Sequence, residues 1–390
     1  MNPENSDAKV RHKQQQVASS AGQQVVATQK KVAIVCEWLV GIGGAERVVL
    51  EVHRMFPEAP IYTSQYDPRE IDWFKNADVR TGWLQKIPSW LKKFIPILRA
   101  YYFSHLDLTG YDLVITCNFG AEAKATRARS GGHVCICNAP THYYWSRYDT
   151  YMKDPGFPRG FNWLAKLGLK LLVYPMRRWD YRAAQNPDYM IAISSHIQKE
   201  IKKYYDRDTH IIFPPVDTKR FNQKQATKRR GFVIAGRHTP YKRIDLAVAA
   251  CTKLNIPLTV IGEGPDTNNL RKIAGPSISF TGLISEKEVA RQFATSEAFI
   301  FPGLDDFGIT PVEAMAAGTP VIAYRGGGAL DYIVPGKTGE FFDEQTVESL
   351  VATMSTFNAS KYSHDDIKKH SENYSCENFH KNLNNFIKIV

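Results

Sequence analysis

The sequence predicts an α/β protein with two successive domains, each containing a parallel sheet between helices. Three observations lead to this class. The chain has 390 residues, more than one compact domain usually holds. Short apolar runs alternate with helical stretches through both halves. A second strand-and-turn start, Gly231–Gly236, follows the polar and basic stretch 222–230, so we expect the halves to join near 215–230.

The first half begins with a polar, Gln-rich stretch at 1–30, which we interpret as a disordered tail. The apolar run Val32–Cys36 then predicts a buried strand, Gly41–Gly44 a turn and Ala45–Val52 a helix. Further strands of this half are predicted at 59–63, 112–116, 133–137 and 189–193. We expect the N-terminal domain to cover 31–220.

The second half repeats the pattern. Strands are predicted within Gly231–Gly236 and at 257–261, 278–280, 298–301 and 320–323, again with helices between them. We expect a C-terminal domain at 221–370. Helices are predicted over residues 344–390. The last helix, 371–390, is predicted to pack back toward the N-terminal domain.

Composition limits the partners and the compartment. Fifty Lys and Arg against 39 Asp and Glu give a net charge of +11, which suits nucleotide phosphates, lipid headgroups or nucleic acid. Six scattered cysteines form neither a disulfide framework nor a zinc-binding spacing. The sequence has no apolar run long enough to span a bilayer and no secretory signal at its start. We therefore expect a cytoplasmic protein with reduced thiols.

Two glycine motifs come close to known phosphate-binding patterns. Gly41 and Gly43 fit the first two positions of a dinucleotide fingerprint, but Glu46 stands where the third glycine is needed, which disfavours an NAD enzyme. The Gly43-Gly44 turn can still bring backbone N–H groups at a helix start to a phosphate or sugar. A simple tight turn is the alternative. Gly336-Lys337-Thr338 lacks the earlier glycine of a P-loop and precedes an apparent strand, so it is predicted to be a turn.

The stretch 299–323 reads as a strand, a loop, a helix and a strand. Asp305 lies in the loop and Glu313 on the helix, while the N–H groups of Phe307, Gly308 and Ile309 lie at the helix N-terminus, which attracts anions. Carboxylates placed there can accept hydrogen bonds from adjacent sugar hydroxyls. A solvated helix cap is the alternative.

A pair of cations follows the first strand of the second half. Arg237 and Lys242 stand in Gly236–Arg243, after a strand and at the entry to a helix. Arginine supplies a fork of donors and lysine a mobile point charge, so the two can hold a diphosphate between them.

With these motifs the sequence closely resembles the retaining glycosyltransferases of family 4, which have the two-domain GT-B fold. The matching pattern is Gly-Arg-x4-Lys at 236–242, followed by a carboxylate-x7-Glu pair with Phe-Gly after the first carboxylate. Gly43-Gly44-Ala45-Glu46 resembles the N-terminal loop of that family. The resemblance covers the chain from about residue 31 to its end.

The resemblance implies a role for each motif. Arg237 and Lys242 would hold the donor diphosphate, Glu313 would hold the ribose hydroxyls, and Asp305 would contact the donor hexose. Asp305 departs from the family, which usually has Glu there, so the sugar must lie closer or a water must bridge. The remaining donor-binding candidates are Gly43, Gly44, Phe307, Gly308, Ile309, Thr310 and, near the nucleobase, Leu283 and Ile284.

A third segment, Cys137–Trp145, resembles the family's His-Thr-Pro-x-Arg-Tyr-x-Trp stretch with two departures. Asn138 replaces the histidine and His142 replaces the arginine. The family histidine lies near the donor sugar, so its polar role is expected to pass to Asn138 or His142. Alternatively, His142 packs beside the neighbouring aromatic side chains.

The segment Trp83–Arg99 carries two tryptophans, four cations and no acid, and 161–184 has similar character. Its cations are Lys86, Lys92, Lys93 and Arg99, and its second tryptophan is Trp90. A basic amphipathic segment with tryptophan is typical of binding to an anionic membrane surface. An ordinary pair of surface helices is the alternative.

The resemblance therefore implies a retaining glycosyltransferase that needs neither a metal nor a cofactor, with a nucleotide diphosphate sugar as co-substrate. It would transfer a hexose to a lipid-linked or polysaccharide acceptor. Similarity to mannosyltransferases of O-antigen assembly suggests GDP-mannose as the donor. The rival classes are an NAD-dependent enzyme, disfavoured by Glu46, and a nucleic-acid-binding protein, disfavoured because no such motif accompanies the cations.

Overall fold

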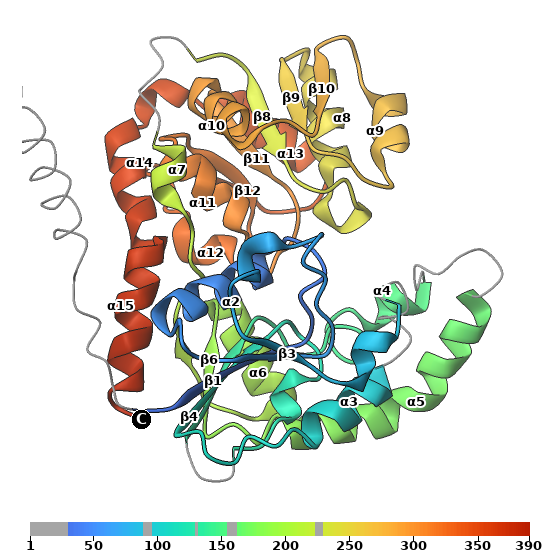
Figure 1. The fold of residues 1–390 in the computed structure, drawn as a ribbon. Helices are drawn as coiled ribbons and strands as arrows, with labels where there is room; N and C mark the ends of the chain where they lie inside the picture. Colours follow the sequence, from blue (N-terminus) through green and yellow to red (C-terminus); the bar gives the residue numbers. More distant parts are fainter. Residues whose placement is uncertain (1–29, 89–95, 129–131, 154–161, 223–228) are drawn as a thin grey trace, which may run out of the picture.

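The computed structural model describes residues 30–88, 96–128, 132–153, 162–222 and 229–390. The chain forms two lobes, each built on one sheet with helices on both faces (Figure 1). The predicted tail, apart from Lys30, and Trp90, Lys92 and Lys93 of the basic segment lie outside the described residues.

The N-terminal lobe has a seven-stranded sheet in the order β3-β2-β1-β4-β5-β6-β7, with every described pair parallel. Its strands are β1 (Val32–Cys36), β2 (Ile61–Thr63), β3 (Val79–Thr81), β4 (Leu113–Asn118), β5 (Gly132–Cys137), β6 (Tyr189–Ala192) and β7 (His210–Ile211). Every residue of β1 and β4 is buried, as expected of central strands with helices on both faces.

The C-terminal lobe has a six-stranded sheet in the order β10-β9-β8-β11-β12-β13, and its described pairs are also parallel. Its strands are β8 (Phe232–Ala235), β9 (Leu258–Ile261), β10 (Ile278–Gly282), β11 (Ala298–Phe301), β12 (Val321–Tyr324) and β13 (Gly339–Phe342). In both sheets the strand order reverses beside the first strand, which is the place where open α/β sheets bind ligands.

Helices fill the connections between strands. Those of the N-terminal lobe are α2 (Gly44–Met55), α3 (Pro96–Ser104), α4 (Tyr148–Lys153), α5 (Asn162–Ala183) and α6 (Ser195–Tyr205). The connection between lobes carries α7 (Thr218–Phe221), and the C-terminal lobe contains α8 (Ile244–Leu254), α9 (Thr267–Ile273), α10 (Glu286–Thr295), α11 (Ile309–Ala316), α12 (Ala329–Tyr332), α13 (Val347–Thr356) and α14 (His364–Ser371).

The last helix, α15 (Cys376–Ile387), runs alongside both lobes (Figure 1). At its start, Ser375 pairs with Val216 of the connection between the lobes. His380 Nε2 lies 2.9 Å from a carboxylate oxygen of Glu51 on α2. Near its end, the Phe386 ring packs against Tyr189 of the N-terminal sheet. The helix therefore ties the C-terminal end of the chain to the N-terminal lobe.

The predicted two-sheet α/β class is confirmed, and a strand lies at each predicted strand position. The short strands β3 and β7 were not predicted. Gly336-Lys337-Thr338 forms a turn before β13, in agreement with the rejection of a P-loop. All six cysteines are free, and Cys376 alone among them is not fully buried.

Candidate active site between the two lobes

A cavity of about 540 Å³ lies where loops of the two lobes meet. It is lined from the N-terminal lobe by the loop after β1, the start of α2 and the loop after β5, and from the C-terminal lobe by the loops after β8 and β11. These loops leave the carboxyl ends of their strands, near the point where each sheet reverses its strand order. The lining includes, among the predicted site residues, Gly43, Gly44, Asn138, Lys242, Asp305, Phe307, Gly308, Ile309, Thr310 and Glu313.

The first glycine loop brings α2 against the opposite lobe. A Cβ at Gly44 would lie 2.8 Å from Cδ1 of Ile309, so a side chain there would require the Ile309 side chain to shift. The cap residue Gly43 supplies no side-chain hydrogen bond to the start of α2. The first N–H groups of α2 thus receive no hydrogen bond from a cap side chain, and this helix start lines the cavity, where it suits an anionic ligand.

A second helix N-terminus faces the same cavity. Gly308 precedes α11 with φ of 86°, a conformation that favours glycine, and a Cβ there would lie 2.9 Å from the hydroxyl of Tyr332. This turn orients the loop so that Asp305 and Glu313 both line the cavity. The predicted carboxylate pair thus frames the N-terminus of one helix.

Asp305 is paired with Lys242 of the loop after β8. The ammonium of Lys242 donates to Oδ2 of Asp305 in a very short contact. Burial opposes the charge on Lys242, but the Asp305 carboxylate outweighs it, and the pKa of Lys242 is raised. Oδ1 of Asp305 is buried and has no hydrogen-bond partner among the described residues. One carboxylate oxygen is therefore available to a donor group of a ligand.

Glu313 is paired with two arginines from outside its own helix. Its Oε1 lies 3.5 Å from Nη1 of Arg47 on α2 and 3.1 Å from Nη2 of Arg220 on α7. Burial raises the pKa of Glu313, and the two guanidinium groups act in the opposite direction. Neither arginine was identified from the sequence, where they carried no motif.

The two candidates after β5 take different places. Asn138 lines the cavity, and its Oδ1 is buried without a partner among the described residues. His142 lies outside the lining, with Nε2 3.0 Å from Oδ2 of Asp306 in the opposite lobe and Nδ1 3.0 Å from the hydroxyl of Ser146. Burial raises the pKa of Asp306, but its pairing with His142 and Arg147 prevails, so the pKa is lowered overall.

Asp306 is a junction between the lobes that the sequence reasoning missed. Its Oδ1 lies 3.2 Å from Nη2 of Arg147, and the hydroxyl of Ser194 donates to its backbone carbonyl at 2.6 Å. The Arg147 guanidinium also lies 5.2 Å from the centre of the Tyr241 ring, beside Lys242. Arg147 lines the cavity and so adds a third cation to it, after Lys242 and Arg47.

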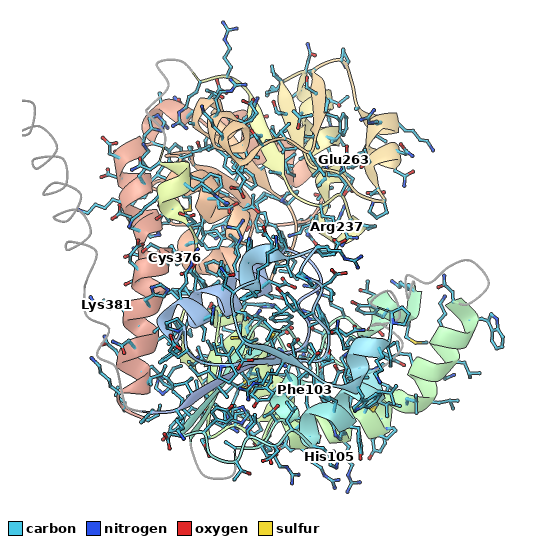
Figure 2. All side chains as sticks on the ribbon, viewed as in Figure 1. Phe103, His105, Arg237, Glu263, Cys376 and Lys381 are labelled. Carbon is cyan, nitrogen blue, oxygen red and sulfur yellow. The ribbon has the colours of Figure 1, made fainter. Side chains whose placement is uncertain are left out.

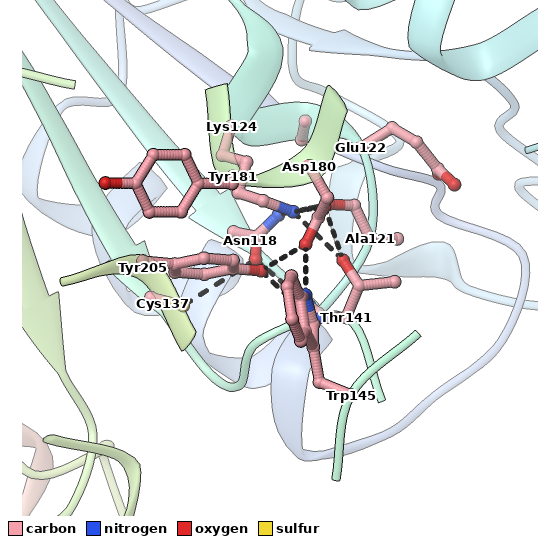
Figure 3. A network of polar contacts seen from close by, with 12 residues as sticks. Asn118, Ala121, Glu122, Lys124, Cys137, Thr141, Trp145, Asp180, Tyr181 and Tyr205 are labelled. Atoms are coloured by element: carbon pink, nitrogen blue, oxygen red, sulfur yellow. Dashed lines mark hydrogen bonds and ion pairs between the residues drawn. The ribbon is translucent and has the colours of Figure 1, made fainter. Parts of the chain in front are cut away.

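A buried polar network supports the loop after β5 (Figure 3). Lys124 and Asp180 form an ion pair at 2.6 Å, with both side chains fully buried. Asp180 accepts hydrogen bonds from the Thr141 hydroxyl at 2.9 Å, the Trp145 indole at 2.8 Å and the Tyr205 hydroxyl at 2.7 Å. One aspartate therefore fixes both ends of the turn that carries His142.

Three predicted donor-binding residues do not line the cavity. Arg237 follows β8 and is exposed; Figure 2 shows it on the side of its lobe that faces the other lobe. Leu283 is 80% exposed, and Ile284 is half-buried against the hydrophobic core. The structure thus brings most of the predicted donor site together and leaves these three at or beyond its edge.

The basic segment requires one correction. Arg99, predicted as one of four cations facing a membrane, is buried, with Nε 2.7 Å from Oε2 of Glu122. It therefore cannot contact lipid. Trp83 remains nearly half exposed, and Lys86 is exposed. Large apolar side chains of α5 are also exposed, namely Trp163, Leu167, Leu171, Leu172 and Tyr174.

Two family models together match most of the chain. Residues 42–220 match the family described as Glycosyltransferase Family 4, and residues 215–374 match Glycosyl transferases group 1. The chain belongs to glycosyltransferase family 4. The cavity lies where these two matched regions meet, and it takes residues from both.

Curated relatives of this glycosyltransferase include mannosyltransferases. The GDP-mannose-dependent alpha-(1-6)-phosphatidylinositol monomannoside mannosyltransferase of Mycobacterium tuberculosis is 28% identical over 198 residues, or 43% of this chain and 51% of the relative. The GDP-mannose-dependent alpha-mannosyltransferase of Mycolicibacterium smegmatis is 34% identical over 114 residues, or 29% of this chain and 30% of the relative. The chain thus spans about half or less of the length of these relatives.

Solved structures show the same GT-B fold. Anabaena HepE in complex with UDP and glucose superposes with a TM-score of 0.66 at 14% identity, over 93% of this chain and all of the other. Sucrose-phosphate synthase from Thermosynechococcus elongatus gives a TM-score of 0.68 at 17% identity, over 92% and 98% of the two chains. At this identity the likeness concerns the fold alone.

The described part of this glycosyltransferase shows neither a membrane-spanning helix nor a metal-binding cluster. Within the described ranges, the helices are all too short or too polar to cross a bilayer. The same ranges bring together no cluster of three His, Cys, Asp or Glu side chains suited to a metal ion. That the enzyme needs no metal ion stays a prediction, because a bound substrate can supply some of the ligands of a metal ion.

Proposed function

We propose that this glycosyltransferase transfers a hexose from a nucleoside diphosphate sugar to its acceptor with retention of the anomeric configuration. The observation that carries the proposal is the interlobe cavity, in which two carboxylates, several cations and two uncapped helix N-termini face one space. Carboxylates suit sugar and ribose hydroxyls, while cations and helix N-termini suit a diphosphate. The family membership supports the same reaction class.

In this proposal the charge on the leaving diphosphate is stabilised by the protein alone. Lys242 and the N-termini of α2 and α11 line the cavity, and Arg237, exposed in the same loop as Lys242, is proposed to reach the diphosphate from outside that lining. Preorganised cations and N–H groups stabilise developing negative charge without a metal ion or further cofactor. The acceptor hydroxyl attacks the face from which the diphosphate departs, and the leaving phosphate oxygen takes its proton. No enzymic nucleophile is then required.

Asn138 is proposed to contact the donor hexose in place of the family histidine. Its Oδ1 lines the cavity without a partner among the described residues, as does Oδ1 of Asp305. Two unpaired acceptors in a shared cavity suit two hydroxyls of one sugar. His142 is proposed to act on the arrangement of the lobes, because its ring is engaged by Asp306.

GDP-mannose is the proposed donor and mannose the transferred hexose, supported by the names of the mannosyltransferase relatives. A lipid-linked acceptor is proposed on two grounds. The M. tuberculosis relative is named for a phosphatidylinositol mannoside. The exposed apolar side chains of α5 share that helix with Lys166, Lys170 and Arg178, a combination that suits an anionic lipid surface. We therefore propose that the enzyme acts at the cytoplasmic face of a membrane.

Thermal-shift titration with GDP, UDP and ADP sugars tests the donor. A ligand at a hundredfold excess over its Kd adds about 2.7 kcal/mol to the stability of the folded state, so the preferred nucleotide raises Tm clearly. NAD and a duplex oligonucleotide serve as controls for the rival classes. Proton NMR of the transferred sugar then reports the anomeric configuration. Absence of any shift with all three nucleotide sugars would overturn the proposal.

A further inference from the structure

Arg47 links the two lobes through the carboxylate proposed to hold the ribose. It lies in the first turn of α2, and its Nη1 reaches Oε1 of Glu313 on α11 at 3.5 Å. The same oxygen lies 3.1 Å from Nη2 of Arg220. Oε1 of Glu313 thus faces two guanidinium groups, that of Arg47 from α2 of the N-terminal lobe and that of Arg220 from α7 in the connection between the lobes.

The two arginines are held with unequal strength. Arg220 has a second acidic partner, since its Nη1 lies 2.6 Å from Oε1 of Glu286. Its contact with Glu313 is also the shorter one. Arg47 reaches Glu313 at a distance near the outer limit of a hydrogen bond. Of the two contacts, the one made by Arg47 costs less to break.

Ribose binding competes with these contacts. A ribose presents two neighbouring hydroxyls, and a carboxylate accepts such a pair on both of its oxygens. Oε1 already accepts from two guanidinium groups and so has no lone-pair direction left. A ribose that takes both oxygens of Glu313 must displace one arginine, and Arg47 is the weaker partner.

A displaced Arg47 needs another anion. Its side chain is only 23% exposed and lines the same cavity as Gly43, Gly44 and Lys242. A partly buried guanidinium without a counter-charge is costly. The diphosphate of a bound donor would bring negative charge into this cavity, next to the N-terminus of the helix that carries Arg47.

We propose that Arg47 is a diphosphate-binding residue supplied by the N-terminal lobe, released from Glu313 when the donor ribose takes that carboxylate. The inference rests on the proposed function and extends it to a residue of the opposite lobe. Arg220 keeps its place and stays paired with Glu313. The bound donor then replaces a direct ion pair between the lobes with one that runs through its phosphates.

The test compares a nucleoside diphosphate with its nucleoside. GDP and guanosine are used, or UDP and uridine if UDP stabilises the wild-type protein more. Arg47→Gln is expected to weaken diphosphate binding about tenfold to a hundredfold, the range for one charge-assisted contact. It should leave nucleoside affinity unchanged or higher, because Oε1 of Glu313 is freed. Arg47→Lys should recover part of the diphosphate affinity by restoring the charge.

Two further variants separate this role from a structural one. Arg220→Gln is expected to weaken both ligands, because Glu313 loses its anchored partner. Arg54→Gln, on the same helix but paired with Glu51, should change neither. If Arg47→Gln weakens nucleoside and diphosphate equally, or weakens neither, the inference is overturned. Failure of the wild-type protein to bind any nucleoside diphosphate would overturn the proposed function as well.

Discussion

The ammonium of Lys242 contacts one carboxylate oxygen of Asp305 and leaves the other oxygen buried without a partner among the described residues. Arg47 and Glu313 form a second pair of a cation and a carboxylate in the lining of the same cavity. In both pairs a cation suited to phosphate holds a carboxylate suited to hydroxyls. A nucleotide sugar offers both kinds of group, so its binding can exchange each internal ion pair for contacts with ligand.

Lys242→Ala is expected to lower turnover at least tenfold, because it removes a charge-assisted contact with the diphosphate worth roughly 1.5–3 kcal/mol. It should also lower stability, since the Asp305 carboxylate is left without its cation. Arg237→Ala is expected to lower turnover by a similar factor but to leave stability unchanged, because its side chain is exposed. Turnover and urea unfolding are measured for both. Near-wild-type turnover in both variants would contradict the diphosphate assignment.

The two carboxylates should separate nucleotide binding from sugar transfer. Glu313→Gln is expected to weaken the nucleoside diphosphate itself at least tenfold, because the ribose belongs to donor and product alike. Asp305→Asn should leave that affinity nearly unchanged and lower kcat, because its proposed partner is the hexose. Calorimetric titration and steady-state rates measure the two effects.

The control for these variants is Asp305→Glu, which restores the longer side chain usual in the family. It should retain more activity than Asp305→Asn. Equal loss of diphosphate affinity in Glu313→Gln and Asp305→Asn would show that the two roles are wrongly assigned.

Asn138 and His142 should differ in what they affect. Asn138→Ala is expected to lower kcat at least tenfold with unchanged diphosphate affinity, since its unpaired Oδ1 lines the cavity and is proposed to bind the donor hexose. His142→Ala removes a contact with Asp306 in the opposite lobe and should loosen the lobes. Small-angle scattering of the ligand-free protein is then expected to show a larger radius of gyration for His142→Ala only. A loss of kcat in His142→Ala alone would reverse the assignment.

Glu37 predicts a pH dependence of stability. It is buried after β1 and accepts hydrogen bonds from Asn118 and from the backbone of Phe119 and Ala123. Burial nevertheless raises its pKa from 4.5 to about 7. Between these values the folded protein holds a proton that the unfolded chain has lost. Stability should therefore fall as pH rises from 4.5 to about 7, by at most about 3 kcal/mol from this group.

Urea unfolding of the wild-type protein and Glu37→Gln across that range measures this contribution. The glutamine variant should show a flatter profile, because it cannot titrate. Its stability at any single pH also reflects the lost acceptor oxygen, so only the slope is informative. Identical slopes for the two proteins would show that Glu37 titrates normally.

The strands that sequence predicted are those with local apolar runs. The strands β3 and β7 were missed because Val79–Thr81 is largely exposed and His210–Ile211 is only two residues long. A strand so exposed or so short has too few buried apolar residues to leave a hydrophobic pattern.

The candidate site likewise contains residues that the sequence could predict and residues that it could not. Lys242, Asp305 and Glu313 stand in local motifs, so their spacing and the family resemblance were enough to predict them as site residues, and all three line the cavity. The roles of Arg47, Arg147 and Asp306 depend on contacts between lobes, which no local pattern records. Arg99 was misassigned for the same reason, since its partner Glu122 lies in a different element. A buried cation is recognised only with its counter-charge.

Membrane binding is predicted for α5, which combines exposed apolar side chains with cations, whereas Arg99 of the segment Trp83–Arg99 is buried. Trp163 and Leu171 are each about two-thirds exposed on this helix, and Lys170 and Arg178 are exposed as well. Apolar side chains insert into the interface independently of salt, whereas cations near an anionic surface contribute about 1 kcal/mol each and are screened by salt. The protein should therefore sediment with anionic vesicles more than with zwitterionic ones, and less at high salt.

Two sets of variants separate these contributions. Replacing Lys166, Lys170 and Arg178 with Gln should abolish the preference for anionic vesicles, a loss of about a hundredfold in affinity if the three contributions add. Replacing Trp163 and Leu171 with Ser should weaken binding to both kinds of vesicle and leave the salt dependence unchanged. Nucleoside diphosphate affinity should stay at the wild-type value in both, because none of these residues lines the interlobe cavity. If the wild-type protein ignores anionic vesicles at low salt, α5 is an ordinary surface helix, and an acceptor free in solution becomes the better hypothesis.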